Sequence, residues 1–172
     1  MRNKMLLTAA LMLAPLSAIA HVSLADNTAA PGAHYVAHFK VGHGCSGSPT
    51  TGLRIVLPVG VSGVVPQPQT GWKVETAMDG AQVKAVTYTG GSLAADAKGE
   101  FLVAMTLPAK TGIFIFPTTQ TCASGSEEWS DAPDMKSGMK STHPAPVLYV
   151  GEPAPKPNSM AQGMVMPDGS RM

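Results

Sequence analysis

Beyond residue 20, apolar residues recur in short runs set between clusters of glycine, proline, serine and aspartate. Residues 82–88 and 101–105 alternate in part between apolar and polar positions, which is typical of half-buried strands. An Asp-Gly pair at residues 79–80 follows one such run and precedes the next, so it predicts a hairpin turn. The other runs predict strands as well, and no helical period interrupts them: 35–41, 53–57, 72–78, 100–107, 112–120 and 147–150.

Short strands at this spacing predict an all-β domain, an immunoglobulin-like or cupredoxin-like β-sandwich of two sheets rather than a closed barrel. The Glu-Pro-Ala-Pro-Lys-Pro run at 152–157 cannot continue a sheet, because proline lacks the backbone donor that a strand ladder needs. We therefore expect one domain over residues 21–150 and a disordered tail rich in proline and methionine over 151–172.

The first twenty residues have the pattern of a secretory signal peptide. Arg2 and Lys4 precede an apolar stretch, and Ala-Ile-Ala at residues 18–20 forms an A-x-A cleavage site. The apolar stretch is shorter than the roughly 20 residues that span a bilayer. We expect a periplasmic or secreted protein, with residues 1–20 removed and no membrane span.

The chain has two cysteines, Cys45 and Cys122. An oxidising compartment favours pairing them, and only one intramolecular pairing exists, so we expect one structural disulfide.

Composition and motifs exclude several functional classes. Charged residues make up only 13% of the chain and the formal net charge is +1, so no basic surface is expected to bind nucleic acid. The sequence has no Gly-x-Ser-x-Gly elbow, no His-Glu-x-x-His zinc motif and no phosphate-binding Gly-Lys-Ser/Thr loop. We expect a protein that is not an enzyme.

Cleavage after residue 20 would make His21 the first residue. Its α-amino nitrogen and its ring Nδ1 could then close a chelate ring on one metal ion. Nitrogen donors in a tetragonal arrangement suit copper(II), which also has the highest affinity among the divalent first-row metals. A terminal His21 is therefore a candidate copper(II) ligand, while the alternative is that an exported chain simply begins with an arbitrary residue.

Several stretches together resemble the YcnI-like copper-binding family: residues 21–24 (HVSL), 39–51 (FKVGHGCSGSPTT), 99–101 (GEF), 120–122 (QTC) and 128–129 (EW). The resemblance implies an exported copper(II) protein with a single-histidine brace. It implies that His21 supplies amine and imidazole, that Glu100 supplies a carboxylate oxygen, and that Trp129 lies beside the metal. The expected function is periplasmic copper storage, buffering or delivery, with another copper chaperone, a transporter or an oxidase as partner.

Further side chains are candidate additional ligands. His43 is expected in a turn beside the disulfide, and it is the leading candidate for a second histidine. Thioethers select copper(I), so methionines before the last strand and in the tail indicate a second, weaker site. The residues concerned are Met135, Met139 and His143, followed by Met160, Met164, Met166 and Met172.

Two alternatives stay open from the residues alone. A disulfide-linked exported sandwich would also suffice as a metal-free interaction or assembly module. A copper oxidase or monooxygenase also starts from an N-terminal histidine, but it needs a second histidine and an open substrate face. A blue-copper centre is disfavoured, because it needs a free cysteine thiolate and the disulfide uses both sulfurs.

Overall fold

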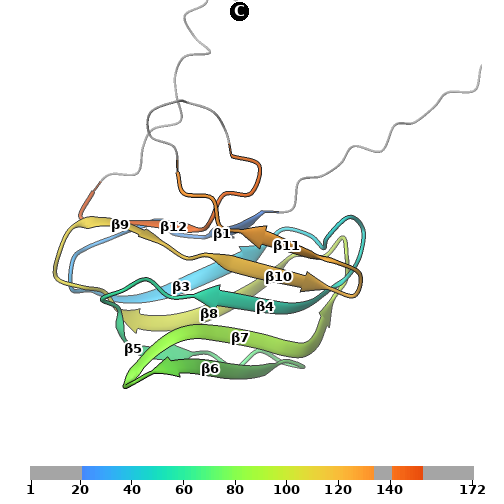
Figure 1. Ribbon diagram of the computed structural model, residues 1–172, viewed down its shortest axis with the longest axis horizontal. Coiled ribbons are helices and arrows are strands. Elements are labelled where there is room, and N and C mark those ends of the chain that lie inside the picture. The colour runs from blue at the N-terminus through green and yellow to red at the C-terminus, as the bar shows by residue number, and fades with distance from the viewer. Residues whose placement is uncertain (1–20, 134–140, 153–172) are drawn as a thin grey trace, which may run out of the picture.

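The computed structural model describes residues 21–133 and 141–152, and within these ranges all regular structure is strand. Twelve strands are described. A four-stranded sheet has the order β1-β3-β8-β5, a five-stranded sheet the order β11-β10-β4-β7-β6, and a three-stranded sheet the order β2-β12-β9. Figure 1 shows the five-stranded sheet in front of the four-stranded one, with β9 and β12 along one border.

The strands have the following bounds: β1 Val22–Leu24, β2 Thr28–Ala29, β3 His34–Val41, β4 Thr50–Val56, β5 Ser62–Pro66, β6 Lys73–Asp79, β7 Gln82–Leu93, β8 Gly99–Thr106, β9 Gly112–Ile115, β10 Thr118–Cys122, β11 Ser126–Trp129 and β12 Val147–Val150. The expected hairpin between residues 78 and 82 is present, since β6 and β7 pair antiparallel and Gly80 takes a positive φ of 58° in the turn. The predicted all-β sandwich is confirmed.

One predicted element is wrong. The run at 112–120, expected as one strand, forms β9 and β10 in different sheets, with Phe116 and Pro117 between them. At this break Phe116 N–H donates to Pro146 and Val56 N–H donates to the Pro117 carbonyl, so the chain passes from the small sheet to the five-stranded one. Proline cannot donate to a ladder, which explains why the strand divides here.

The core lies between the two larger sheets and is filled by the alternate residues that point inward. On β3 and β8 the inward positions include Phe39 and Phe101, which are 0% and 1% exposed. Phe39 meets Phe116 edge-on with ring centroids 5.5 Å apart, and Tyr88 lies 5.0 Å from Phe101. Edge and tilted contacts of this kind stabilise aromatic cores beyond the area they bury.

The predicted disulfide is confirmed. Cys45 follows β3, Cys122 ends β10, and their Cα atoms are 6.0 Å apart. The bond ties the chain leaving β3 of the four-stranded sheet to β10 of the five-stranded sheet.

Candidate metal centre

His21 immediately precedes β1, the edge strand of the four-stranded sheet. Val22 pairs with Val41, so His21 runs alongside Gly42, and a Cβ placed on Gly42 would lie 3.7 Å from the His21 backbone oxygen. The His21 ring leaves the strand toward the opposite sheet, where its centroid is 5.5 Å from that of Trp129 with the planes tilted by 31°. The amino-terminal edge of the domain therefore brings His21 and Trp129 together.

Trp129 ends β11 and is only 2% exposed. Its indole Nε1–H donates to Gln120 Oε1 at 3.2 Å, which fixes the ring in the space between the sheets. A second histidine, His143, packs against the same indole with centroids 5.4 Å apart. Since an indole offers only an N–H donor and that donor is used, Trp129 contributes an apolar surface here rather than a ligand.

Gln120 is a buried residue of the 120–122 stretch to which the sequence assigned no role. It lies on β10 between Thr118 and Cys122, all three facing inward, and it is 0% exposed. Its Nε2 donates to the His43 carbonyl oxygen and to Thr50 Oγ1, both at 2.8 Å. A polar residue at an inward position of a strand was the available signal, because such a residue needs buried partners.

His43 lies in the turn after β3, as expected, and is partly buried. Its Nδ1 is 2.9 Å from the Gly44 carbonyl oxygen. Its Nε2 is buried and has no hydrogen-bond partner among the residues the structure describes. Gly44 permits this turn, since a Cβ there would lie 1.9 Å from the Ser48 carbonyl oxygen.

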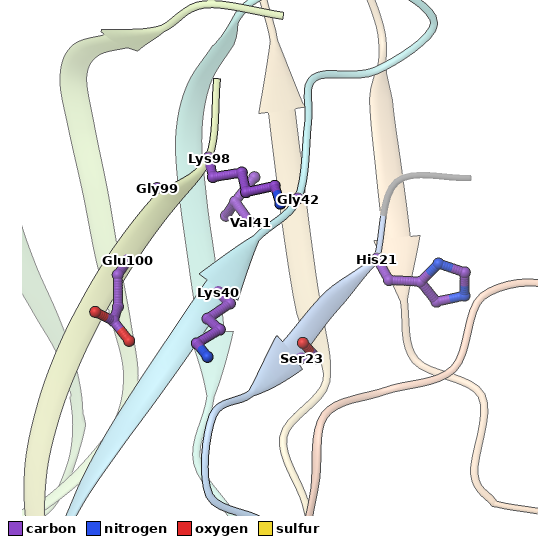
Figure 2. Close-up of a pocket in the computed structure, with 8 residues that line it drawn as sticks. All are labelled: His21, Ser23, Lys40, Val41, Gly42, Lys98, Gly99 and Glu100. Atoms are coloured by element: carbon purple, nitrogen blue, oxygen red, sulfur yellow. The ribbon is translucent and has the colours of Figure 1, made fainter. Parts of the chain in front are cut away.

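Glu100 lies on β8, two strands away from β1. It pairs across the sheet with Lys40, which in turn pairs with Ser23. Its Oε1 is 3.1 Å from His38 Nδ1 on β3, and both side chains are partly exposed. Figure 2 shows the Glu100 carboxylate and the His21 ring on opposite sides of Lys40 and Ser23.

A surface pocket of about 460 Å³ nevertheless includes both Glu100 and His21 in its lining. Two lysines, Lys40 and Lys98, contribute positive charge to it. The other lining residues are Ser23, Val41, Gly42 and Gly99. The structure thus places Glu100 and His21 in one pocket without bringing their side chains together.

His143 is held beside Trp129 by polar contacts on both ring nitrogens. Its Nε2 is 3.3 Å from Glu127 Oε2 and its Nδ1 is 3.0 Å from Thr142 Oγ1. Asp131 anchors the same segment through its backbone pairing and through its carboxylate, which accepts from Ser141 and from the His143 N–H. The hydrogen bond from the Ser141 hydroxyl is the main reason that the pKa of Asp131 lies below its usual value.

The predicted methionine ligands Met135 and Met139, and those of the tail, lie outside the described residues. Over residues 21–133 and 141–152, no three His, Cys, Asp or Glu side chains are gathered closely enough to hold a metal ion. A brace has a different donor set, because its first nitrogen is a terminal amine that His21 acquires only when the preceding peptide bond is cut. The α-amine and ring nitrogen that a terminal His21 would present suit a nitrogen-preferring ion such as copper(II). The buried Nε2 of His43 is a further nitrogen without a hydrogen-bond partner in the described part of the chain.

Within the described ranges, no helix has the length and apolar character needed to cross a membrane.

Comparison with known proteins identifies both a family and a fold. The family model described as "Domain of unknown function (DUF1775)" matches residues 21–150. The crystal structure of an uncharacterized protein from Nocardia farcinica, described as immunoglobulin-like, is 27% identical, with a TM-score of 0.67 over 76% of this chain and 97% of that chain. This likeness supports the immunoglobulin-like sandwich. No curated protein matches the chain.

Two cohesins show weaker similarity, each at 10% identity and a TM-score of 0.43. One is the non-cellulosomal cohesin of Archaeoglobus fulgidus, matched over 77% of this chain and 91% of that chain. The other is the seventh ScaB type I cohesin of Pseudobacteroides cellulosolvens, matched over 81% and 96%.

Proposed function

We propose that this chain, which belongs to the DUF1775 family, is an exported copper(II)-binding protein. It stores, buffers or delivers copper in the periplasm. The metal is held by His21 once the signal peptide has been removed. The observation that carries the proposal is the position of His21, at the edge of the sandwich with its ring 5.5 Å from the buried indole of Trp129. The family match is consistent with the resemblance to YcnI-like proteins.

The proposed site uses two nitrogens of a single residue. The α-amine and Nδ1 of His21 close a chelate ring, and the amine, with a reference pKa of about 7.7–8.0, must lose its proton to bind. Copper(II) affinity should therefore fall as the pH drops below that value. A peptide bond before His21 removes the amine, so signal cleavage acts as the activating step.

Trp129 supports the site by excluding water. The ring is almost fully buried and is held by Gln120, so it gives the His21 imidazole a fixed apolar surface to pack against. A hydrophobic shell around a metal controls solvent access and restricts the geometry of the ligands. Trp129→Phe should leave copper bound but change the EPR parameters, because the neighbouring ring is smaller.

Glu100 is the proposed oxygen ligand, and this assignment rests on the resemblance. A hard carboxylate oxygen would neutralise part of the charge of the ion. To reach it, Glu100 would leave His38, which it contacts at 3.1 Å, and turn within the pocket that it lines together with His21. If Glu100→Gln leaves both the copper spectrum and the affinity unchanged, Glu100 does not belong to the ligand set.

The proposal is tested by copper(II) titration followed by EPR on processed protein that begins at His21, compared with protein that retains Ala20. Processed protein should bind one copper(II) tightly with a nitrogen-rich tetragonal spectrum, and the longer form should lose that spectrum. His34→Gln is a matched control, because His34 contacts Thr106 at the far end of β3 and should be irrelevant. Equal tight binding by both forms would exclude the brace, and absence of binding by both would leave the metal-free interaction module.

A further inference from the structure

The surface pocket of about 460 Å³ beside His21 contains two lysines for which the proposed copper site has no use. Lys40 is the next-to-last residue of β3, and Lys98 directly precedes β8. A cleft lined by charges of one sign concentrates ions of the opposite sign. We propose that this pocket binds a small monocarboxylate, such as the anion of an α-hydroxy acid, and this inference does not depend on copper binding.

Strand pairing brings the two lysines together at one end of the four-stranded sheet. Lys40 pairs with Glu100 across β3 and β8, and two positions further along the same pair of strands Lys98 runs alongside Gly42. All four residues line the pocket. Figure 2 shows both lysine side chains between the Glu100 carboxylate and the His21 ring. An anion in the pocket would therefore have an ammonium group from each of two adjacent strands nearby.

The positive charge of the pocket is not balanced by the protein. Within residues 21–133 and 141–152, neither lysine forms an ion pair or a hydrogen bond. Glu100 lies directly across from Lys40, but its Oε1 contacts His38 Nδ1 at 3.1 Å instead. With His21 neutral, two ammonium groups face one carboxylate in the lining, which leaves one positive charge in excess.

The residues of the lining favour a carboxylate over a phosphate. A singly charged anion matches the single excess charge, whereas the second charge of a phosphate would be repelled by Glu100. Phosphate sites also commonly use arginine side chains or the backbone N–H groups of a helix N-terminus, and the lining of this pocket contains neither. The hydroxyl of Ser23 and the carboxylate of Glu100 can hydrogen-bond a hydroxyl group next to the carboxylate of the ligand.

Gly42 keeps the pocket open. A Cβ placed on Gly42 would meet only the His21 backbone oxygen, at 3.7 Å, which is an ordinary van der Waals contact. The volume of the pocket also lies within the range of about 300–1,000 Å³ that is typical of small-molecule sites. A larger side chain at position 42 would therefore fill the pocket without removing either lysine.

NMR titration of the processed, metal-free protein with lactate at constant ionic strength tests the inference. The backbone amides of Lys40, Gly42, Lys98 and Gly99 should shift in a saturable way. Lactamide has a similar shape without the charge and should cause no such shift, and inorganic phosphate should bind more weakly than lactate. Absence of a saturable shift with lactate, or phosphate binding as tightly as lactate, would overturn the proposal. Because the titration contains no metal, neither failure bears on the proposed copper function.

Substitutions then locate the ligand. Lys40→Met and Lys98→Met should each weaken lactate binding by about two- to fivefold, the range expected for exposed charge pairs, and the double variant should no longer saturate. Lys110→Met is the matched control, because Lys110 is exposed and lies outside the pocket, and it should bind lactate like the wild type.

Gly42→Leu should abolish lactate binding although both lysines remain, because the leucine side chain would occupy the pocket. The lysine variants change only exposed side chains, so they test the site even if Gly42→Leu does not fold. If Lys110→Met weakens lactate binding as much as Lys40→Met and Lys98→Met do, the attraction is a general effect of charge and the proposed site is wrong.

Discussion

Replacing Gln120 by methionine tests the buried polar contacts that hold the candidate site in place. The substitution keeps the length of the side chain and removes all three of its hydrogen bonds. Two groups then lose the one partner that the structure gives them, the indole N–H of Trp129 and the carbonyl oxygen of His43. Thr50 Oγ1 keeps only a weak contact with the sulfur of Cys122 at 4.0 Å.

The expected loss of stability follows from the number of buried polar groups that lose their hydrogen-bond partner. Each buried donor or acceptor left without a partner costs about 1–3 kcal/mol, which gives about 2–6 kcal/mol for the two groups. Burying an apolar thioether side chain in place of an amide recovers part of this cost. We expect a net loss of about 3 kcal/mol in the free energy of unfolding, and a Tm lowered by about 6–12 °C for a domain of this size.

Denaturant and thermal unfolding of the oxidised, processed protein measure this difference. Thr118→Val is the matched control, because Thr118 faces inward on the same strand and donates one hydrogen bond, to Phe116 two residues away. It should cost about 1 kcal/mol. If Gln120→Met costs no more than Thr118→Val, the polar contacts of Gln120 do not hold Trp129 and His43 in place, and the structural argument for the site is wrong.

Three further predictions concern the scaffold. Reducing the disulfide, which closes a 77-residue separation, should lower the unfolding free energy by about 4 kcal/mol in melts with and without reductant. Burial raises the pKa of Tyr35 and Tyr88 to about 12, with the charge of Asp26 adding to the effect on Tyr35. Tyrosines of the unfolded chain ionise near pH 10, so the raised pKa values lower the stability of the fold only at alkaline pH. The unfolding free energy should be unaffected by these two tyrosines below pH 10 and should fall as the pH rises from about 10 to about 12. An ultraviolet titration in which both tyrosines of the folded protein ionise near pH 10 would contradict this prediction. Gly44→Ala places a methyl group 1.9 Å from the Ser48 carbonyl oxygen, a backbone atom, and should lower the unfolding free energy by about 3 kcal/mol or more. A variant that melts at the wild-type temperature would show that the turn containing His43 and Gly44 is not packed against Ser48 in this way.

The sequence predicted the strands whose apolar positions alternate or form long runs, and it missed those that do not. β3, β4, β6, β7, β8 and β12 all correspond to predicted runs. β1 and β2 have only three and two residues, too few to establish a period. β11 has the sequence Ser-Glu-Glu-Trp, in which only Trp129 is buried, so it shows no alternation and no strand was predicted there.

The candidate site was predictable in part. The cleavage-site pattern at residues 18–20 predicted an oxidising compartment, and this expectation together with a count of only two cysteines was enough to predict the disulfide. His21 and Trp129 lie at edge strands of two different sheets, β1 and β11, so no spacing along the sequence predicts their contact. Only the resemblance to the YcnI-like family indicated that the two residues are close together. The sequence named His43 and included Gln120 in the 120–122 stretch, but the burial of His43 Nε2 and the contacts of Gln120 came only from the three-dimensional packing, because a hydrogen bond between residues 77 apart leaves no periodic signal.

The most direct test of the account is the fluorescence of Trp129 during copper(II) titration in a Trp72→Phe background, which leaves one tryptophan. A paramagnetic ion held by the His21 nitrogens would lie close to the indole and quench its emission. Processed protein should lose most of its emission at one equivalent of copper(II), and protein retaining Ala20 should keep it. Equal quenching of the two forms would contradict the claim that the free amine of His21 creates the site.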